Sequence, residues 1–260
     1  MTFGAVSMRS PQMCIDGRFV PGATHLPVVD AGGRCVLRLP RASEPQVVQA
    51  VNGAVAAAAS WRATPGVQRS RLLTALLWQF EAAWPQLHES MSDDPVEAEA
   101  ELEQARAMLV GWAGWADKWA DQWPEPVEPL GVVAILAPAH GLHAWLQPLL
   151  TALVAGNAVV FVDGGMPLFA ERVAQLMVCA GWPAGLVQVL MGDRFAVAGH
   201  ICRCGDVAAV AADRADDALW TTLTGSVADK SLIALPGCES VDDPLAPWLA
   251  LPFCRVRTRS

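Results

Sequence analysis

The sequence predicts an α/β fold: a doubly wound parallel sheet with an N-terminal antiparallel arm and helices. Three observations support this prediction. Beyond residue 130, short apolar runs alternate with segments of helical character. Continuous apolar strands are typical of a parallel sheet that helices cover on both faces, and right-handed crossovers make such a sheet doubly wound. The chain of 260 residues is 53% hydrophobic and 17% charged, a globular composition with enough length for a large core.

Composition and charge argue against several classes of protein. The net charge is −8 and lysine occurs only at Lys118 and Lys230, so we expect no nucleic-acid partner. The longest apolar run, residues 149–162, is too short to span a bilayer, and the N-terminus lacks a signal-peptide pattern. The seven cysteines have no framework spacing, which is typical of free thiols in a reducing cytosol. We therefore expect a cytoplasmic protein that does not contact a membrane.

The N-terminal part begins with strands and continues with helices. Residues 13–41 alternate short apolar runs with turn residues, and Asp16-Gly17 and Gly32-Gly33 are the expected turns of an antiparallel arm. Ser43 followed by Gln46 is a capping-box pattern, which predicts a helix over 44–59.

Two further helices are expected before residue 124. The first covers about 67–88, where Pro85 would kink or shorten it. The second follows Asp93-Asp94-Pro95, and we expect its alternate glutamates to form a solvated face. It carries four tryptophans on one predicted helical face, which could be a cofactor box or a partner surface but which we interpret as a packing face: Trp112, Trp115, Trp119 and Trp123.

The proline-rich segment 124–129 is the best internal boundary. We expect an N-terminal tail over 1–12, an arm and helical part over 13–128, a βαβ part of the same domain over 129–243, and a C-terminal tail over 244–260. The predicted strands of the βαβ part are 131–137, 158–162, 186–190 and 207–212, and the helices between them are 142–155, 167–180 and 194–203.

Several phrases, in this order and at these distances, resemble the aldehyde dehydrogenase superfamily: CIDGRFVPG, VLRLPRASE, WRATPGVQRSRLL, GWADK, EPLGVVAIL, LVAGNAVVF and AGWPAGLVQVLMGD. The resemblance covers the chain to about residue 243 and implies a Rossmann-like coenzyme domain. It also implies a chemistry: members of that superfamily bind NAD(P), attack an aldehyde with a cysteine thiolate and release the acid with a glutamate base. Each of those groups can be sought in this sequence.

The turn after the first parallel strand departs from the superfamily. The resemblance places an asparagine oxyanion donor there, and this chain has Pro138-Ala139-His140-Gly141-Leu142. His140 can also donate a hydrogen bond. His140 and His143 form an HxxH pair, but two ligands at such a turn are too few for a metal site, so we assign no metal.

The expected cofactor contacts are replaced as well. Where the superfamily has a lysine and a glutamate, this chain has Val162-Asp163-Gly164-Gly165. Asp163 could accept from a ribose hydroxyl, but we interpret it as a turn aspartate beside two flexible glycines. The turn that would approach a pyrophosphate aligns with 213–215, within a run containing three carboxylates. Thr224-Gly225-Ser226 imitates that turn but aligns with the following helix.

The catalytic groups are missing from their expected positions. Ala234 stands where the resemblance places the general base, and a methyl group cannot accept a proton. Only Cys238 and Cys254 follow it, neither in the expected sequence context. The cluster His200, Cys202 and Cys204 is spaced too tightly for a zinc site. We therefore assign no catalytic, cofactor-binding or metal-binding residue.

These departures predict a degenerate and truncated member that is not an enzyme and needs no cofactor. We expect a structural or regulatory subunit with a protein partner, either a full-length aldehyde dehydrogenase or a second copy. Between the tryptophan-rich helix and the next strand there is no room for the superfamily's oligomerisation hairpin, so assembly would differ. Two alternatives stay open: a residual NAD or NADP binder that uses Asp163, and an active NAD(P)-dependent aldehyde oxidoreductase with Cys238 as nucleophile.

Overall fold

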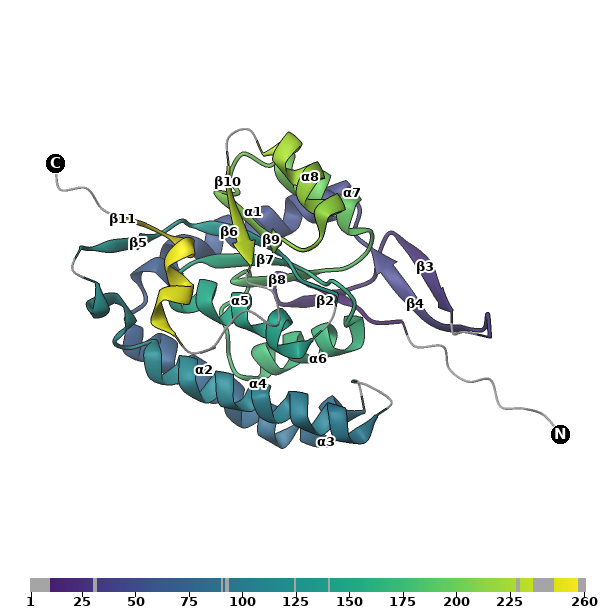
Figure 1. Cartoon of the computed structure of the whole chain (residues 1–260), viewed down its shortest axis with the longest axis horizontal. Coiled ribbons are helices and arrows are strands. Elements are labelled where there is room, and N and C mark those ends of the chain that lie inside the picture. The colour runs from purple at the N-terminus through teal and green to yellow at the C-terminus, as the bar shows by residue number, and fades with distance from the viewer. Residues whose placement is uncertain are drawn as a thin grey trace.

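The centre of the molecule is a seven-stranded mixed sheet (Figure 1). The computed structural model describes residues 10–29, 32–89, 91, 94–123, 125–139, 141–227, 230–235 and 246–256. Five strands are parallel and the last two in the row are antiparallel. The order is β10 (Ser231–Leu235), β9 (Ala209–Asp213), β6 (Val132–Leu136), β7 (Ala158–Val162), β8 (Val187–Leu190), β1 (Met13–Ile15) and β2 (Arg18–Val20). The predicted α/β fold with a doubly wound parallel sheet is confirmed.

The two central strands explain why the parallel sheet was visible in the sequence. Every residue of β6 and β7 is buried, so neither strand has the polar alternation of a half-exposed strand. Helices end as predicted beside this sheet, at Gly156 (φ 98°) and Gly181 (φ 78°). Only glycine adopts such positive φ values without strain.

The predicted N-terminal arm consists of two hairpins, one in the main sheet and one outside it. The first, β1–β2, turns at Asp16-Gly17 and extends the main sheet because β1 pairs with β8. The Asp16 N–H donates to Gln188 Oε1 (2.8 Å), and Gln188 Nε2 donates to Asp16 Oδ1 (3.0 Å), which fixes this addition. Only the second hairpin, β3 (Thr24–Val29) and β4 (Cys35–Arg41), is a separate two-stranded arm.

The N-terminal helices follow the predicted capping signals. The Ser43 N–H donates to Gln46 Oε1 (3.0 Å), which confirms the capping box. The predicted second helix is broken just before Pro85, because that proline occupies the first turn of a new short helix. Asp93 lies outside the described residues, and Asp94 accepts from the Val96 N–H (2.9 Å). The helices are α1 (Glu44–Ala63), α2 (Gly66–Ala82), α3 (Trp84–His88) and α4 (Pro95–Trp115).

The four tryptophans near residue 115 pack against the core but do not share one helix. Helix α4 ends at Trp115, and Trp119 opens the 3-10 helix η1 (Trp119–Gln122). Trp112 and Trp119 are buried, and Trp119 Nε1 donates to the Pro247 carbonyl (2.8 Å). Trp115 and Trp123 are partly buried against the core. The prediction of a packing face is confirmed, whereas the single helical face is wrong.

Helices cover both faces of the sheet. Helices α1, α7 and α8 are in contact on one face, and α5 and α6 cover the other, with α2 and α4 packed outside them (Figure 1). No described helix is long and apolar enough to cross a membrane. The helices of this half are α5 (Leu142–Val154), α6 (Pro167–Cys179), α7 (Arg194–Arg203) and α8 (Asp217–Ser226).

The predicted boundary at 124–129 contains a strand. Pro124 lies outside the described residues, but β5 (Val127–Pro129) pairs antiparallel with β11 (Cys254–Val256). A 3-10 helix, η2 (Pro247–Phe253), leads into β11. The predicted C-terminal tail therefore contains a strand that pairs with the predicted boundary segment. The domain limits at 12, 128 and 243 stay predictions.

Candidate functional site at the carboxyl edge of the sheet

The loops that follow the parallel strands meet at one edge of the sheet, where α/β proteins commonly bind ligands. Strand β6 has β7 on one side and β9 on the other, so the order of the strands reverses there. Asp163 follows β7 and Asp213 ends β9, which brings these predicted positions to the same edge. His140 follows β6 and lies outside the described residues.

The two glycines after Asp163 are required by close packing of two loops. A Cβ atom on Gly164 would lie 2.1 Å from the Ala137 carbonyl oxygen. One on Gly165 would lie 2.7 Å from the Ala139 carbonyl oxygen. The expectation of a flexible glycine pair is therefore wrong, since these residues let the loop after β7 press against the loop after β6.

Asp163 forms hydrogen bonds within its own turn. Its Oδ1 accepts from Trp145 Nε1 (3.1 Å) and from the Met166 N–H (3.0 Å), and the side chain is buried. Burial raises the pKa of Asp163, while the bonds from Trp145, Met166 and Gly165 act in the opposite direction. The carboxylate thus closes the turn before α6 rather than facing a ribose hydroxyl.

This buried carboxyl predicts a pH dependence of stability. A native pKa above the ordinary 3.8 means that the folded state binds the proton more tightly, so this contribution to stability is complete at low pH and is lost as pH rises through the native pKa. We expect urea unfolding of the wild type to show this fall and Asp163→Asn to lack it. Asp117→Asn, at an exposed carboxyl, should follow the wild type. Parallel pH curves for wild type and Asp163→Asn would contradict the assignment.

The four helices that start at this edge each have a carboxylate of the chain at their N-terminal turn. At α5, Glu101 accepts from the Leu142 N–H; burial raises the pKa of Glu101 and this bond opposes the rise. Before α6, Asp163 accepts from the Met166 N–H (3.0 Å). The other contacts are Asp193 with the Phe195 N–H at α7 (3.0 Å) and Asp216 with the Leu219 N–H at α8 (3.1 Å). The positive ends of these helix dipoles therefore already face negative charge.

The expectation that the alternate glutamates of α4 form a solvated face is wrong for Glu101. Its side chain is half-buried because α4 crosses the start of α5. The sequence offered no signal for this contact, which joins residues 41 positions apart.

Two cations near this edge contact the same acidic loop, and one of them, Arg194, keeps its Nε and Nη2 buried without a hydrogen-bond partner in the described part of the chain. Arg194 Nη1 lies 3.3 Å from Asp216 Oδ2, and Arg214 Nη1 lies 3.3 Å from Asp217 Oδ1. Thr224 and Ser226 lie in the last turn of α8, where their hydroxyls donate to helix carbonyls. Their predicted place in the helix after the acidic loop is confirmed.

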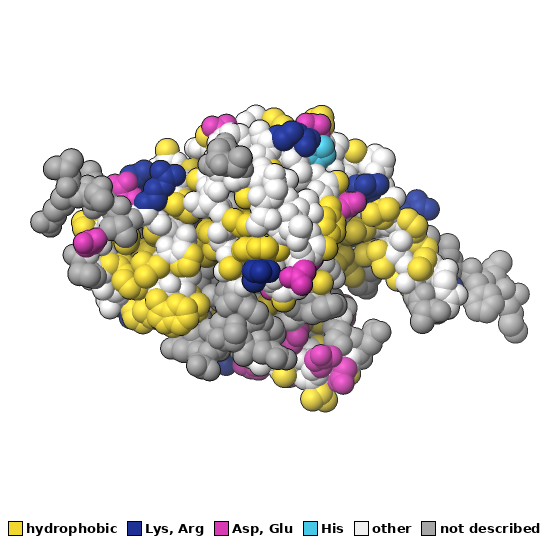
Figure 2. Space-filling view, turned by 45° about the horizontal axis from the view of Figure 1, so that its top comes forward, with side chains coloured by type: hydrophobic (Ala, Val, Ile, Leu, Met, Phe, Trp, Pro, Cys, Tyr) yellow, Lys and Arg dark blue, Asp and Glu magenta, His cyan; other side chains and the backbone are white. Residues whose placement is uncertain are grey.

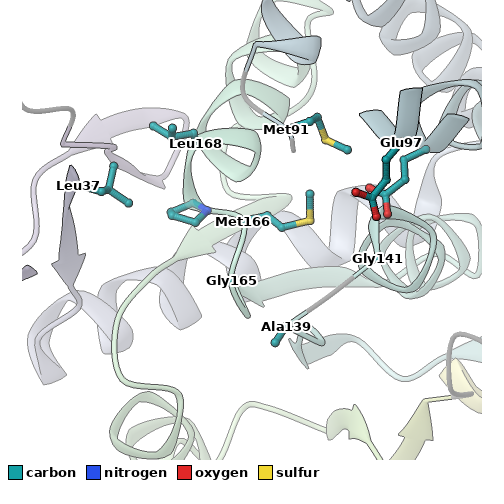
Figure 3. A pocket seen from close by; sticks show the side chains of 10 residues that line it. Leu37, Met91, Glu97, Ala139, Gly141, Gly165, Met166 and Leu168 are labelled. Atoms are coloured by element: carbon teal, nitrogen blue, oxygen red, sulfur yellow. The ribbon is translucent and has the colours of Figure 1, made fainter. Parts of the chain in front are cut away.

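A cavity of about 400 Å³ opens between the loops after β6 and β7 and the start of α4 (Figure 3). Figure 3 shows Met166 and Glu97 projecting into it from opposite sides. The described lining side chains include carboxylates and thioethers but no cation and no thiol: Leu37, Met91, Glu97, Glu101, Ala139, Gly141, Gly165, Met166, Pro167 and Leu168. An anionic ligand therefore meets like charge here.

Of the remaining predicted positions, those that the structure describes supply no base, nucleophile or metal ligand set. Ala234 is exposed on β10 and lines a separate apolar cavity. Cys238 lies outside the described residues, and burial raises the pKa of Cys254 to about 12. Among the described residues, no group of three His, Cys, Asp or Glu side chains could hold a metal ion.

The reactivity of the cysteine thiols can be measured directly. Six described cysteines are free, and burial raises the pKa of Cys14 to about 11. Because the thiolate is the reactive form, we expect iodoacetamide at neutral pH to modify exposed Cys179 while Cys14 and Cys254 react only after denaturation. Peptide mass spectrometry over time measures this order. Modification of Cys14 or Cys254 as fast as Cys179 in the folded chain would contradict it.

Comparisons with known proteins give a consistent relationship. The model of the "Aldehyde dehydrogenase family" matches residues 19–212. The chain is 29% identical over 209 residues to a hydroxyisobutyraldehyde dehydrogenase of Mycolicibacterium austroafricanum, covering 70% of this chain and 40% of that protein. It is 30% identical over 205 residues to a 3,6-anhydro-alpha-L-galactose dehydrogenase of Streptomyces coelicolor, covering 71% and 41%. The chain thus spans about 40% of the length of these curated relatives.

Solved structures agree on the fold. A crystal structure of an NAD-dependent aldehyde dehydrogenase from Sinorhizobium meliloti superimposes with a TM-score of 0.75 at 24% identity, covering 86% of this chain and 49% of that one. A betaine aldehyde dehydrogenase from Staphylococcus aureus in complex with NAD+ gives a TM-score of 0.73 at 19% identity, covering 88% and 49%. At these identities the likeness shows the fold alone.

Proposed function

The chain belongs to the aldehyde dehydrogenase family, and from that membership we propose that it is a non-catalytic member that acts as a structural or regulatory subunit beside a full-length aldehyde dehydrogenase. The single observation that carries this proposal is the set of carboxylates at the carboxyl edge. Helices α5 to α8 each direct their N-terminal turn at Glu101, Asp163, Asp193 or Asp216.

The residues at this edge do not fit a dinucleotide. A pyrophosphate is normally held by unoccupied N–H groups at a helix N-terminus, and a carboxylate beside those groups repels it. Asp213, Asp216 and Asp217 lie together on the loop after β9. At an effective dielectric constant of about 20, two unit negative charges about 4 Å apart repel by roughly 4 kcal/mol. Arg194 and Arg214 offset part of this repulsion, because they pair with Asp216 and Asp217.

The relatives are named as dehydrogenases, and this chain shares their fold, but its described residues include no recognisable set of reacting groups. Aldehyde oxidation needs a base and an activated thiolate. Ala234 offers a methyl group, and the pKa of Cys254 is raised to about 12 by burial. We expect the purified chain to reduce neither NAD nor NADP with a panel of aldehydes. Any activity that Cys238→Ala removes would overturn the proposal in favour of an oxidoreductase.

The β3–β4 hairpin is the surface we assign to the protein partner. All six residues of β3 are exposed, and the hairpin presents exposed Leu26, Val28, Val29 and Val36. Figure 1 shows it projecting from the body, and Figure 2 shows hydrophobic side chains gathered over it. Exposed apolar patches of this kind are typical of interaction sites.

Co-expression with a full-length aldehyde dehydrogenase from the same organism tests the pairing. We expect a stoichiometric complex in size-exclusion chromatography with light scattering. Val29→Asp with Val36→Asp should abolish it, because both side chains are exposed and the fold does not depend on them. Val67→Asp, on exposed α2, is the matched control and should leave the complex intact. A monodisperse monomer that ignores the dehydrogenase would contradict the assignment.

A further inference from the structure

A second cavity, the η2 pocket, lies between α5, β10 and η2 and has a volume of about 240 Å³. Helix α5 packs directly against η2, so the pocket is built from segments about 100 residues apart in the chain. Its walls are formed by Gln147, Pro148, Thr151, Ile233, Ala234, Leu235, Trp248, Leu249, Pro252 and Phe253.

The walls determine the charge of any ligand. None of the described residues that line the η2 pocket is ionisable, and most are aliphatic or aromatic. A charged ligand would lose its hydration without gaining a counter-ion, so the pocket selects a neutral molecule. Trp248, whose side chain is 56% exposed, stands at the rim and offers a ring surface to an entering ligand.

Gln147 carries the largest polar side chain among the described lining residues. The residue is only 3% exposed, and its backbone carbonyl already accepts from Thr151 Oγ1 (3.0 Å). Its side-chain amide is therefore the group that a ligand in the pocket would pair with, because buried amides are normally hydrogen-bonded. A primary amide offers both donors and an acceptor, so its best complement is a carboxamide or a hydroxyl group.

The volume sets the size of the ligand. A dry apolar cavity of about 150 Å³ accommodates benzene, whereas drug-sized ligands occupy about 300 Å³ or more. A cavity of about 240 Å³ therefore matches one substituted ring or an aliphatic chain of similar bulk.

We propose that the η2 pocket binds a small uncharged molecule with an apolar body and one carboxamide or hydroxyl group, which forms hydrogen bonds with the Gln147 amide. The described lining residues include no thiol or titratable group, so they hold the ligand without reacting with it. The site needs neither a dinucleotide nor a protein partner, and the proposal is therefore independent of the function proposed above.

Benzamide is the probe, and toluene and benzoate are its comparators. Titration of the 260-residue chain by ligand-observed NMR should give a dissociation constant of about 1 mM or tighter for benzamide. Toluene lacks the polar group and benzoate is charged, so each should bind at least about tenfold more weakly. Equal binding of benzoate and benzamide, or no benzamide binding at about 10 mM, would overturn the proposal.

Two variants locate the site. Gln147→Leu should weaken benzamide by about tenfold and leave toluene unchanged or tighter, because only the hydrogen bonds are lost. Ala234→Phe should abolish binding of benzamide and of toluene, because the added ring fills the pocket. If Ala234→Phe does not fold, Trp248→Ala is the second variant and should weaken both ligands. Gln68→Leu, on exposed α2, is the control. If Gln147→Leu binds benzamide as tightly as the wild type, the proposal is wrong. If the wild type is a dimer and Ala234→Phe dissociates it, the pocket is part of an interface between two copies of the chain.

Discussion

Replacing Arg69 with methionine is expected to lower the free energy of unfolding by about 3–5 kcal/mol. The guanidinium is largely buried and donates to three carbonyl oxygens: Val154 (3.0 Å), Trp61 (3.1 Å) and Arg62 (3.1 Å). These carbonyls belong to the last turns of α1 and α5, and the Trp61 carbonyl also accepts from the Thr64 N–H (3.0 Å). The same cation lies over the Trp61 ring, 5.4 Å from its centroid. Methionine keeps the apolar contact and loses all three hydrogen bonds.

Urea unfolding measures this loss, and α2 provides its own control. Arg71 is exposed two residues away, so Arg71→Met should change stability by less than about 0.5 kcal/mol. Equal stability of Arg69→Met and Arg71→Met would show that Arg69 does not tie α1 to α5.

The second large effect is expected for Gly164→Ala. The added methyl would lie 2.1 Å from the Ala137 oxygen and 2.4 Å from the Pro138 oxygen, and both are backbone atoms that cannot rotate away. One of the two loops must therefore move, which we expect to destabilise the fold by at least about 3 kcal/mol. Thermal and urea unfolding measure the change.

Gly225→Ala is the matched control for that substitution. Gly225 lies inside α8, and nothing surrounds its Cβ position within 4 Å. Alanine there should raise stability by about 0.5–1 kcal/mol through helix propensity. A Gly164→Ala variant as stable as Gly225→Ala would mean that the loops after β6 and β7 are not in close contact.

The elements that could be predicted from sequence depend on local signals. The runs that became β6 and β7 are wholly apolar and short, which identifies buried strands without knowledge of their neighbours. The Ser43 and Gln46 capping box needs only its own four residues. Ala234 and the acidic loop after β9 could be recognised because a family resemblance supplied the positions to compare.

The rest depends on contacts between distant segments. Glutamates at alternate helix positions look solvated, and only the crossing of α4 over α5 brings Glu101 to the Leu142 N–H. In the sequence, Gly164 looks like an ordinary turn glycine, because its close contact with the Ala137 carbonyl is visible only in the folded structure. Gln147 lies in an apolar helix, and its place in the wall of a pocket follows only from the packing of η2 against that helix. No period or motif encodes such approaches.

Calorimetric titration of the 260-residue chain with NAD and NADP tests the central claim most directly. The claim is that carboxylates of the chain occupy the helix N-termini where a pyrophosphate would bind. We predict no binding heat at ligand concentrations up to about 1 mM, because Asp213, Asp216 and Asp217 repel the phosphates. A micromolar dissociation constant, with the phosphates located against the loop after β9, would contradict it.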